Sequence, residues 1–252
     1  MMNNRGLQLK SFALIVIVCL WVSFSFAAMN HKEILRKADM ARGNYEGVQW
    51  KVHVYSIEKG HKQNRKLEVK ARGYDFLAIL TSPPKVKRNK LLMVDHNMWF
   101  AKPGVKKPVP VSSRQKFLGG ASYGDIAATN YANDYEPTKI TSGEVNGEAC
   151  YLFDFKSATR KATYDRIKYW ISKERMVGIK AEYYTVSGKM FKWATFEYEN
   201  QVMIEGKSNP FISKMLINDV VASGNITTMI FSKPQLVPVP PSALDLNFLM
   251  MR

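Results

Sequence analysis

The chain has 252 residues, a formal net charge of +16, and hydrophobic residues at 46% of its positions. A chain of this length buries roughly 70% of its unfolded surface, enough for a core and a cavity besides. The positive charge suits anionic partners such as lipid headgroups, membrane surfaces or nucleic acid, and equally a basic surface that only aids solubility.

The N-terminus predicts a secretory leader. Arg5 and Lys10 precede an apolar run from 12 to 26, and Ser25 and Ala27 place small residues at the −3 and −1 positions of a cleavage site. We expect cleavage after Ala27, export to the periplasm, and a single domain over residues 28–252. Export argues against nucleic acid as a partner.

Two other interpretations of this N-terminal segment have less support than a cleaved leader. A retained anchor needs about 20 apolar residues, and this run has about 15. A lipoprotein site at Cys19 is not favoured, because the flanking Val18 and Leu20 are bulky. Once the leader has left, Cys150 is the remaining cysteine, so no intramolecular disulfide is expected.

The first element after the leader is a helix over 31–42. Asn30 is a suitable N-cap, the apolar residues share one face, and Gly43 ends the helix. The period then changes to two, because Val48, Trp50, Val52 and Val54 alternate with polar residues, which is typical of a strand with one wet face.

Further strands are predicted along most of the chain. They span 65–72, 76–81, 90–94, 98–102, 139–145, 148–156, 164–172, 176–186, 189–198, 213–222 and 226–232. Short turns such as Asn146-Gly147 join them, which favours antiparallel pairing. We therefore predict a mainly β (α+β) fold of about eleven strands, with residues 234–241 extended over the surface.

An irregular insertion over 106–137 interrupts the strands. It contains Gly119-Gly120 and then a segment that we expect to form a short helix capped by Asp125. Long irregular insertions in compact domains are usually functional or disordered. Its aromatic residues argue against disorder.

No catalytic motif is complete. Ser122 lies in a G-x-S-x-G sequence, but all four histidines precede it, whereas the elbow requires a later histidine. Ser113 and Lys116 match S-x-x-K without the downstream Lys-Thr-Gly element. No pair of residues has zinc-ligand spacing. We therefore expect no catalytic residues, no metal and no cofactor, although an acid pair that meets only in space remains open.

One stretch resembles a known family. A strand with Met98-Trp99-Phe100 leads to Pro103-Gly104-Val105-Lys106, then to a loop with Ser113 and Gln115, then to Gly119–Ser122 and Asp125. This order resembles the outer-membrane lipoprotein-sorting, LolA-like family, and the order of predicted elements is similar over nearly the whole exported chain.

The resemblance implies a half-open, curved antiparallel β-barrel around an N-terminal helix and a helical lid or plug. It further implies an apolar cavity for acyl chains of lipoproteins or lipids in transit to the outer membrane. The implied partners are an inner-membrane transporter, in some members an exporter of the resistance-nodulation-division type, and an outer-membrane acceptor.

Three sets of residues are candidates for this function. Apolar strand positions that would line the cavity are Trp50, Val52, Val54, Leu91, Met93, Trp99, Phe153, Phe155, Ile167, Tyr169, Ile171, Phe191 and Trp193. The lid would consist of Phe117, Gly119, Gly120, Tyr123 and Tyr131. Lys102, Lys106, Lys107 and Arg114 would meet headgroups or a partner. The plain alternatives are ordinary core, a static loop and solvated charges.

Two other functions remain open at this point. The curved sheet of an envelope scaffold or regulator would bind a protein segment instead of a lipid. A hydrolase of lipids or peptidoglycan would use an acid pair. Bound lipid would indicate the carrier, a stable protein partner would indicate the scaffold, and turnover would indicate the hydrolase.

Overall fold

The computed structural model describes residues 30–127 and 129–250. The predicted leader lies outside these residues. Helix α1 spans His31–Met40, and Asn30 Oδ1 accepts a hydrogen bond from the Lys32 N–H at 3.0 Å, as the N-cap prediction requires. Ile34, Leu35 and Ala38 form its buried face. The predicted helix is confirmed.

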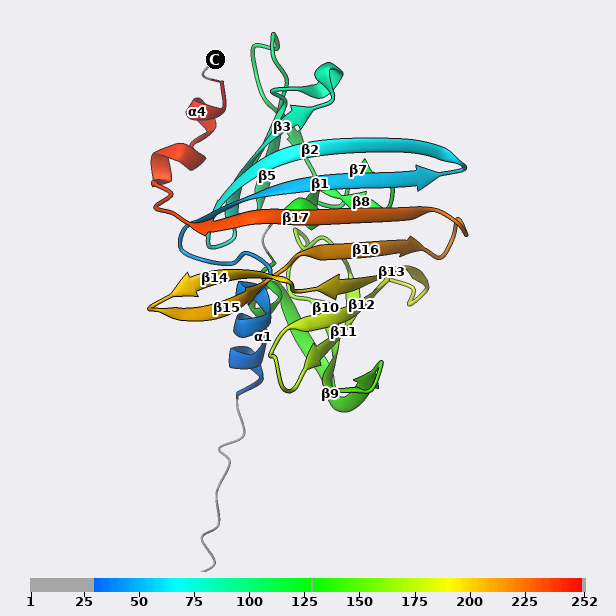
Figure 1. The fold of residues 1–252 in the computed structure, drawn as a ribbon. Coiled ribbons are helices and arrows are strands. Elements are labelled where there is room, and N and C mark those ends of the chain that lie inside the picture. Colours follow the sequence, from blue (N-terminus) through cyan, green and yellow to red (C-terminus); the bar gives the residue numbers. More distant parts are fainter. Residues whose placement is uncertain (1–29, 128, 251–252) are drawn as a thin grey trace, which may run out of the picture.

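Antiparallel strands dominate the described chain (Figure 1). The strands of the large sheet are β1 (Val48–Glu58), β2 (His61–Arg72), β3 (Asp75–Ser82), β4 (Lys90–Val94), β5 (Asn97–Ala101), β6 (Val109–Val111), β9 (Tyr135–Val145), β10 (Glu148–Ser157), β11 (Arg166–Ser172), β12 (Gly178–Tyr184), β13 (Met190–Glu197), β16 (Lys214–Asp219) and β17 (Ile226–Leu236). Their order is β6-β5-β4-β3-β2-β1-β17-β16-β13-β12-β11-β10-β9, and β6 and β9 are not paired with each other. The sheet is curved and open, as a half-open barrel requires.

The predicted number of strands was too low. Within residues 30–127 and 129–250 the large sheet has thirteen strands, and two small hairpins lie outside it. These are β7 (Lys116–Leu118) with β8 (Ala121–Ser122), and β14 (Asn200–Ile204) with β15 (Lys207–Phe211). Strands β7 and β8 are too short, with 3 and 2 residues, to show a period, and β14 and β15 contain many polar residues. The edge strand β6 contains Pro110, which an edge tolerates because one side of its backbone has no partner.

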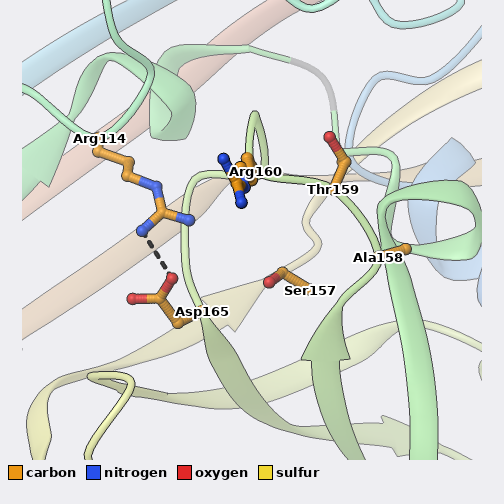
Figure 2. A pocket seen from close by; sticks show the side chains of 6 residues that line it. All are labelled: Arg114, Ser157, Ala158, Thr159, Arg160 and Asp165. Atoms are coloured by element: carbon orange, nitrogen blue, oxygen red, sulfur yellow. Dashed lines mark hydrogen bonds and ion pairs between the residues drawn. The ribbon is translucent and has the colours of Figure 1, made fainter.

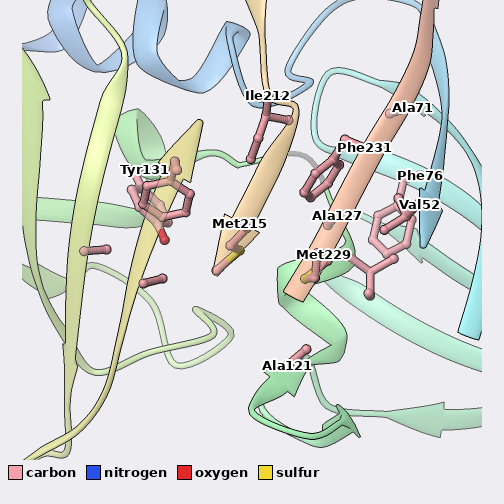
Figure 3. Close-up of a cluster of buried hydrophobic side chains, with 14 of the residues drawn as sticks. Val52, Ala71, Phe76, Ala121, Ala127, Tyr131, Ile212, Met215, Met229 and Phe231 are labelled. Carbon is pink, nitrogen blue, oxygen red and sulfur yellow. The ribbon is translucent and has the colours of Figure 1, made fainter. Parts of the chain in front are cut away.

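The core lies on the concave face of the sheet. In β1, Val48, Trp50, Val52 and Val54 are buried in strict alternation. Helix α1 and residues of the insertion pack against this face, and Figure 3 shows Ala121 and Ala127 of the insertion in the same cluster as Met215 and Met229 of the sheet. The curved sheet therefore surrounds segments that are not part of it.

The insertion contains two one-turn helices, α2 (Tyr123–Ile126) and α3 (Tyr131–Asp134). Ser122, not Asp125, is the N-cap of α2. Asp125 is the third helical residue, and its Oδ2 accepts a hydrogen bond from the Ser122 N–H at 2.8 Å, which closes a capping box. The prediction that Asp125 caps the helix was wrong, because its side chain points back to the preceding turn.

The C-terminal tail, which we predicted to be extended over residues 234–241, also contains regular elements. Strand β17 continues to Leu236, and the chain then forms η2 (Pro241–Leu244) and α4 (Leu246–Met250). Leu244 and Leu249 pack with Leu77 and Leu92 on the convex side of β3 and β4. The tail thus buries apolar side chains that the sheet would otherwise expose.

Candidate functional site

The insertion fills the concave side of the sheet. We call residues 116–127 and 129–134, which carry β7, β8, α2 and α3, the plug. Leu118, Ile126 and Tyr131 of the plug are buried in the main core cluster. The plug touches the sheet through side chains and a few polar contacts, so the sheet would remain intact if it moved.

The strongest polar contact of the plug centres on Asp125. Its Oδ2 lies 2.9 Å from Lys192 Nζ, and the Tyr164 hydroxyl donates to the same carboxylate at 2.7 Å. Lys192 also donates to the Gly120 carbonyl at 2.8 Å. All three side chains are buried, because Lys192 points from β13 toward the concave core. A charge in the core is tolerated only when it is paired, as here.

Gly119 and Gly120 form a tight contact between plug and sheet. Gly119 has a φ of +59°, and a Cβ at this position would lie 2.1 Å from Thr227 Oγ1 and 2.2 Å from Ser56 Oγ. The Gly120 N–H donates to Thr227 Oγ1 at 2.8 Å. A residue without a side chain is therefore needed at 119, both for its backbone and for the space.

Helix α1 and Asn44, just after it, hold the other end of the plug. Asp39 Oδ2 accepts a hydrogen bond from the Ala132 N–H at 2.9 Å, and Asn44 donates to the Thr129 carbonyl at 2.7 Å. Burial raises the pKa of the Asp39 carboxyl to about 7, although the N–H groups of Ala132 and Tyr131 oppose this shift. Burial also raises the pKa of Asp134, which lies 3.6 Å from His96 Nδ1.

Arg42 occupies an aromatic cage beneath α3. Its guanidinium carbon lies 4.4 Å from the ring centre of Phe196 and 5.5 Å from that of Tyr131. Arg42 Nε and Nη1 have no hydrogen-bond partner within the described residues, and neither has the Tyr169 hydroxyl. The positive charge thus lies against two π faces, which a guanidinium contacts favourably.

The space enclosed at this place is small. The pocket lined by Arg42, Tyr74, Asp125, Tyr131 and Tyr164 has a volume of about 20 Å³. That is room for about one water molecule, whereas ligand pockets have volumes of about 300–1,000 Å³. The structure therefore describes a form in which the plug leaves no room here for an acyl chain.

The structure brings most of the predicted cavity residues together. The buried residues of the main core cluster include Trp50, Val52, Val54, Leu91, Met93, Phe153, Phe155, Ile167, Tyr169 and Ile171. Phe191 is half-buried and packs on Tyr164. Trp99 and Trp193 are not in this cluster. Trp99 lies with Leu92 in the convex cluster under the tail. Trp193, on β13, is paired in register with Glu182 of β12 and Asn218 of β16.

The predicted lid residues all lie in or beside the plug. Phe117 and Tyr123 are half-buried neighbours, with ring centres 5.9 Å apart. Tyr131 is buried and contacts Tyr135, Phe155 and Tyr169 edge-on. Lid motion itself remains a prediction.

The four predicted cations have different surroundings. Lys102, Lys106 and Lys107 are exposed between β5 and β6. Arg114 is paired: it donates to Asp165 Oδ1 at 2.7 Å (Figure 2). It also donates to the Ala162 carbonyl at 2.9 Å. A surface hollow of about 460 Å³ lies beside this pair and is lined mainly by polar residues, among them Arg160. Arg114 thus attaches the start of the insertion to the β10–β11 loop.

Sequence reasoning missed Asp39, Arg42, Asp125 as a charge partner, and Lys192. A lysine between apolar residues of a strand was the available signal for Lys192, since Ala194 and Phe196 follow it on the same face. Ser122 is buried, and Tyr164 rather than a histidine lies 3.5 Å from its Oγ. Within the described residues, no group of three or more His, Cys, Asp or Glu is placed to hold a metal, and no helix is long and apolar enough for a membrane span.

Comparisons with known proteins agree with this architecture. A family model described as an uncharacterized protein matches residues 73–250, well over half of the chain. No curated protein matches this chain. A LolA superfamily protein from Nitrosomonas europaea is similar in structure, with a TM-score of 0.78 and 26% identity over 88% of this chain and 100% of that one.

Two further solved structures share the fold. A putative outer membrane lipoprotein-sorting protein domain from Vibrio parahaemolyticus has a TM-score of 0.74 and 16% identity, over 87% of this chain and 98% of that one. A DUF1329 family protein from Desulfovibrio piger has a TM-score of 0.73 and 16% identity, over 86% and 97%. The chain therefore belongs to the family whose model matches residues 73–250, and it has the fold of the LolA superfamily.

Proposed function

We propose that this protein is a periplasmic carrier that binds acyl chains of lipoproteins or lipids and transfers them toward the outer membrane. In this proposal the leader over residues 1–27 is removed, and residues 28–252 act as one domain that is not an enzyme. An inner-membrane transporter loads it and an outer-membrane acceptor unloads it. The similarity to lipoprotein-sorting proteins supports the class of cargo.

The observation that carries the proposal is the plug. A separate segment occupies the concave face of an open sheet and is held there by individual polar contacts rather than by a strand ladder, at Lys116, Gly120, Asp125, Thr129, Ala132 and Asp134. Displacing it would uncover apolar side chains such as Met215 and Met229 without breaking a strand pair of the large sheet. Flexible methionine side chains suit a surface that must accept varied chains.

The energetics require such a surface. Exposing an acyl chain of about sixteen carbons to water costs on the order of 12 kcal/mol, at about 0.8 kcal/mol for each methylene. Free diffusion across the periplasm is therefore negligible. The enclosed volume beside the plug is only about 20 Å³, so an acyl chain must replace the plug in order to bind. Binding of the acyl chain and displacement of the plug are therefore one event in this proposal.

The charged residues complete the proposal. Lys102, Lys106 and Lys107 extend from the β5–β6 loop and are available to headgroups or to an acidic patch on a transporter or acceptor. Arg114 is already paired with Asp165, so its role is to hold the insertion rather than to meet a headgroup.

Lipid extraction tests the cargo. The protein is released from the envelope of an expressing cell, its N-terminus is determined by mass spectrometry, and an organic extract of the folded protein is analysed for lipid. We expect co-purifying acyl lipid or saturable binding of a fluorescent fatty acid that envelope lipid displaces. If the protein shows neither bound lipid nor such displacement, the carrier proposal is wrong.

A reversible crosslink tests the plug. A Cβ on Gly120 would lie 3.9 Å from the Ile217 Cβ, close to the separation of about 3.8 Å in a disulfide. The double variant Gly120→Cys/Ile217→Cys should bind no fatty acid when oxidised and regain binding when reduced. Ile217→Cys alone controls for the change in the core. Equal binding in both redox states would show that the plug does not need to move.

The filled interior also favours a second candidate, a scaffold whose curved sheet binds a protein segment. That function predicts a lipid-free protein with a stable envelope partner on pull-down, and it predicts that the oxidised crosslink leaves partner binding unchanged.

A further inference from the structure

Large apolar side chains are exposed at one end of the sheet. Val186 lies in the turn between β12 and β13 and is 78% exposed, and Val221 lies in the turn between β16 and β17 and is 70% exposed. Val220, Ile57 and Ile226 beside them are exposed as well. Water-exposed aliphatic side chains that gather on one edge usually mark an interaction site.

The strand pairing places these side chains in one row. Ile57 is opposite both Ile226 of β17 and Lys62 of β2. Asp219, at the end of β16, is opposite Lys192 near the start of β13. The β1–β2, β16–β17 and β12–β13 turns therefore lie at the same end of six adjacent strands, roughly 25 Å across at about 4.8 Å per strand. Figure 1 shows the three turns together on the right of the molecule.

The row carries unbalanced positive charge. Lys59, Lys62 and Lys189 are exposed on these turns, and no ion pair within the described part of the chain neutralises them. The two acids at this end are engaged, since Glu58 pairs with Lys116 and Asp219 Oδ1 accepts hydrogen bonds from the N–H groups of residues 221 and 222.

A basic hollow adjoins the row. Lys156, Arg166 and Val186 line a surface depression of about 360 Å³, which Asp165 also borders. Asp165 is already paired with Arg114. The depression is wide enough for a headgroup, and its unpaired charges are positive.

We propose that these three turns form a docking surface for an anionic lipid bilayer, with Val186 and Val221 entering the interface and the surrounding lysines meeting lipid phosphates. Apolar side chains flanked by cations match the layers of a bilayer surface, where headgroups are charged and the acyl boundary lies just beneath. An acidic protein patch would match the cations but would leave Val186 and Val221 in water.

Vesicle flotation tests this surface. The envelope-released protein is mixed with vesicles of phosphatidylcholine alone or of phosphatidylcholine with phosphatidylglycerol. We expect binding to the anionic vesicles that weakens with added salt, and weak binding to the neutral ones. The assay measures membrane association and not cargo, so it stands or falls separately from the carrier function.

Matched variants locate the contact. Val186→Asp/Val221→Asp should weaken binding to anionic vesicles by more than about tenfold, and each of Lys59→Gln and Lys189→Gln by about fivefold. Met203→Asp is the control, because Met203 is 61% exposed on the β14–β15 hairpin at the opposite side of the molecule (Figure 1). No binding by the parent protein, or equal loss in the control and the turn variants, would overturn the proposal.

Discussion

The Lys192 ammonium and the Asp125 carboxylate are 2.9 Å apart, and their side chains are only 4% and 3% exposed. The pair joins β13 to the plug across 67 positions of the chain. The desolvation cost of a buried pair of this kind roughly cancels its attraction, but removal of one partner leaves an uncompensated charge in the core. The pair therefore fixes where the plug sits more than it adds to net stability.

Removing one charge should expose this asymmetry. We expect Lys192→Met to lower the free energy of unfolding by about 3–5 kcal/mol, because Asp125 then stays buried without its counter-ion. Urea denaturation measures the loss. The double variant Lys192→Met/Asp125→Asn should recover most of it, since the amide is neutral and still accepts from Ser122 and Tyr164. Equal losses in the single and double variants would contradict this account.

Local patterns in the sequence predicted much of the sheet. The alternation from Val48 to Val54 gave the correct buried face of β1, and Asn30 correctly marked the start of α1. Such predictions succeed where one segment carries its own period and cap. The prediction of an open, curved sheet came instead from the resemblance to a family.

The same patterns fail where a distant partner decides. In β13 the period of two allows either Phe191 and Trp193 or Lys192 and Ala194 to face the core, and the two large aromatic residues favour the first choice. The structure has the second, because Asp125 from the plug neutralises Lys192. Trp99 differs for a similar reason: the tail covers the convex face at β4 and β5, so this aromatic residue is half-buried on that side.

The protonation of Asp39 should make stability depend on pH. Its pKa is about 7 in the folded protein and about 3.9 in an unfolded chain. Between these values the folded protein holds a proton that the unfolded chain has released. The free energy of unfolding therefore falls as the pH rises from about 4 to 7, by at most on the order of 4 kcal/mol.

The variant Asp39→Asn should remove this part of the slope, because an amide does not titrate and its oxygen still accepts from the Ala132 N–H. Urea midpoints measured across this pH range compare the variant with the parent. Asp134 has a raised pKa as well and contributes in the same direction, so the difference between the two proteins is the informative quantity. Parallel curves would show that Asp39 is not the group responsible.

Gly119 should tolerate no side chain. In Gly119→Ala the new Cβ meets Thr227 Oγ1 and Ser56 Oγ at about 2 Å, and the positive φ adds roughly 1 kcal/mol of strain. We expect a total loss of about 2–4 kcal/mol, with faster proteolysis of the plug, because overpacking forces the plug off the sheet. Gly104→Ala is the control, since Gly104 has a φ of +85° with no atom near its Cβ; it should cost only about 1 kcal/mol.

The C-terminal tail should contribute to global stability although it lies outside the sheet. Leu244 is buried against Leu77 and Leu92, so Leu244→Ala removes packed methyl groups and should cost about 2–3 kcal/mol. Leu246, two residues further on, is exposed, and Leu246→Ala should cost less than about 0.5 kcal/mol. Thermal and urea unfolding of both variants provide the comparison. A large loss confined to Leu244→Ala would mean that β3, β4 and the tail unfold as one unit. That result requires the tail to cover the convex face in the native protein. Equally small losses in both variants would instead mean that the tail unfolds separately from the sheet.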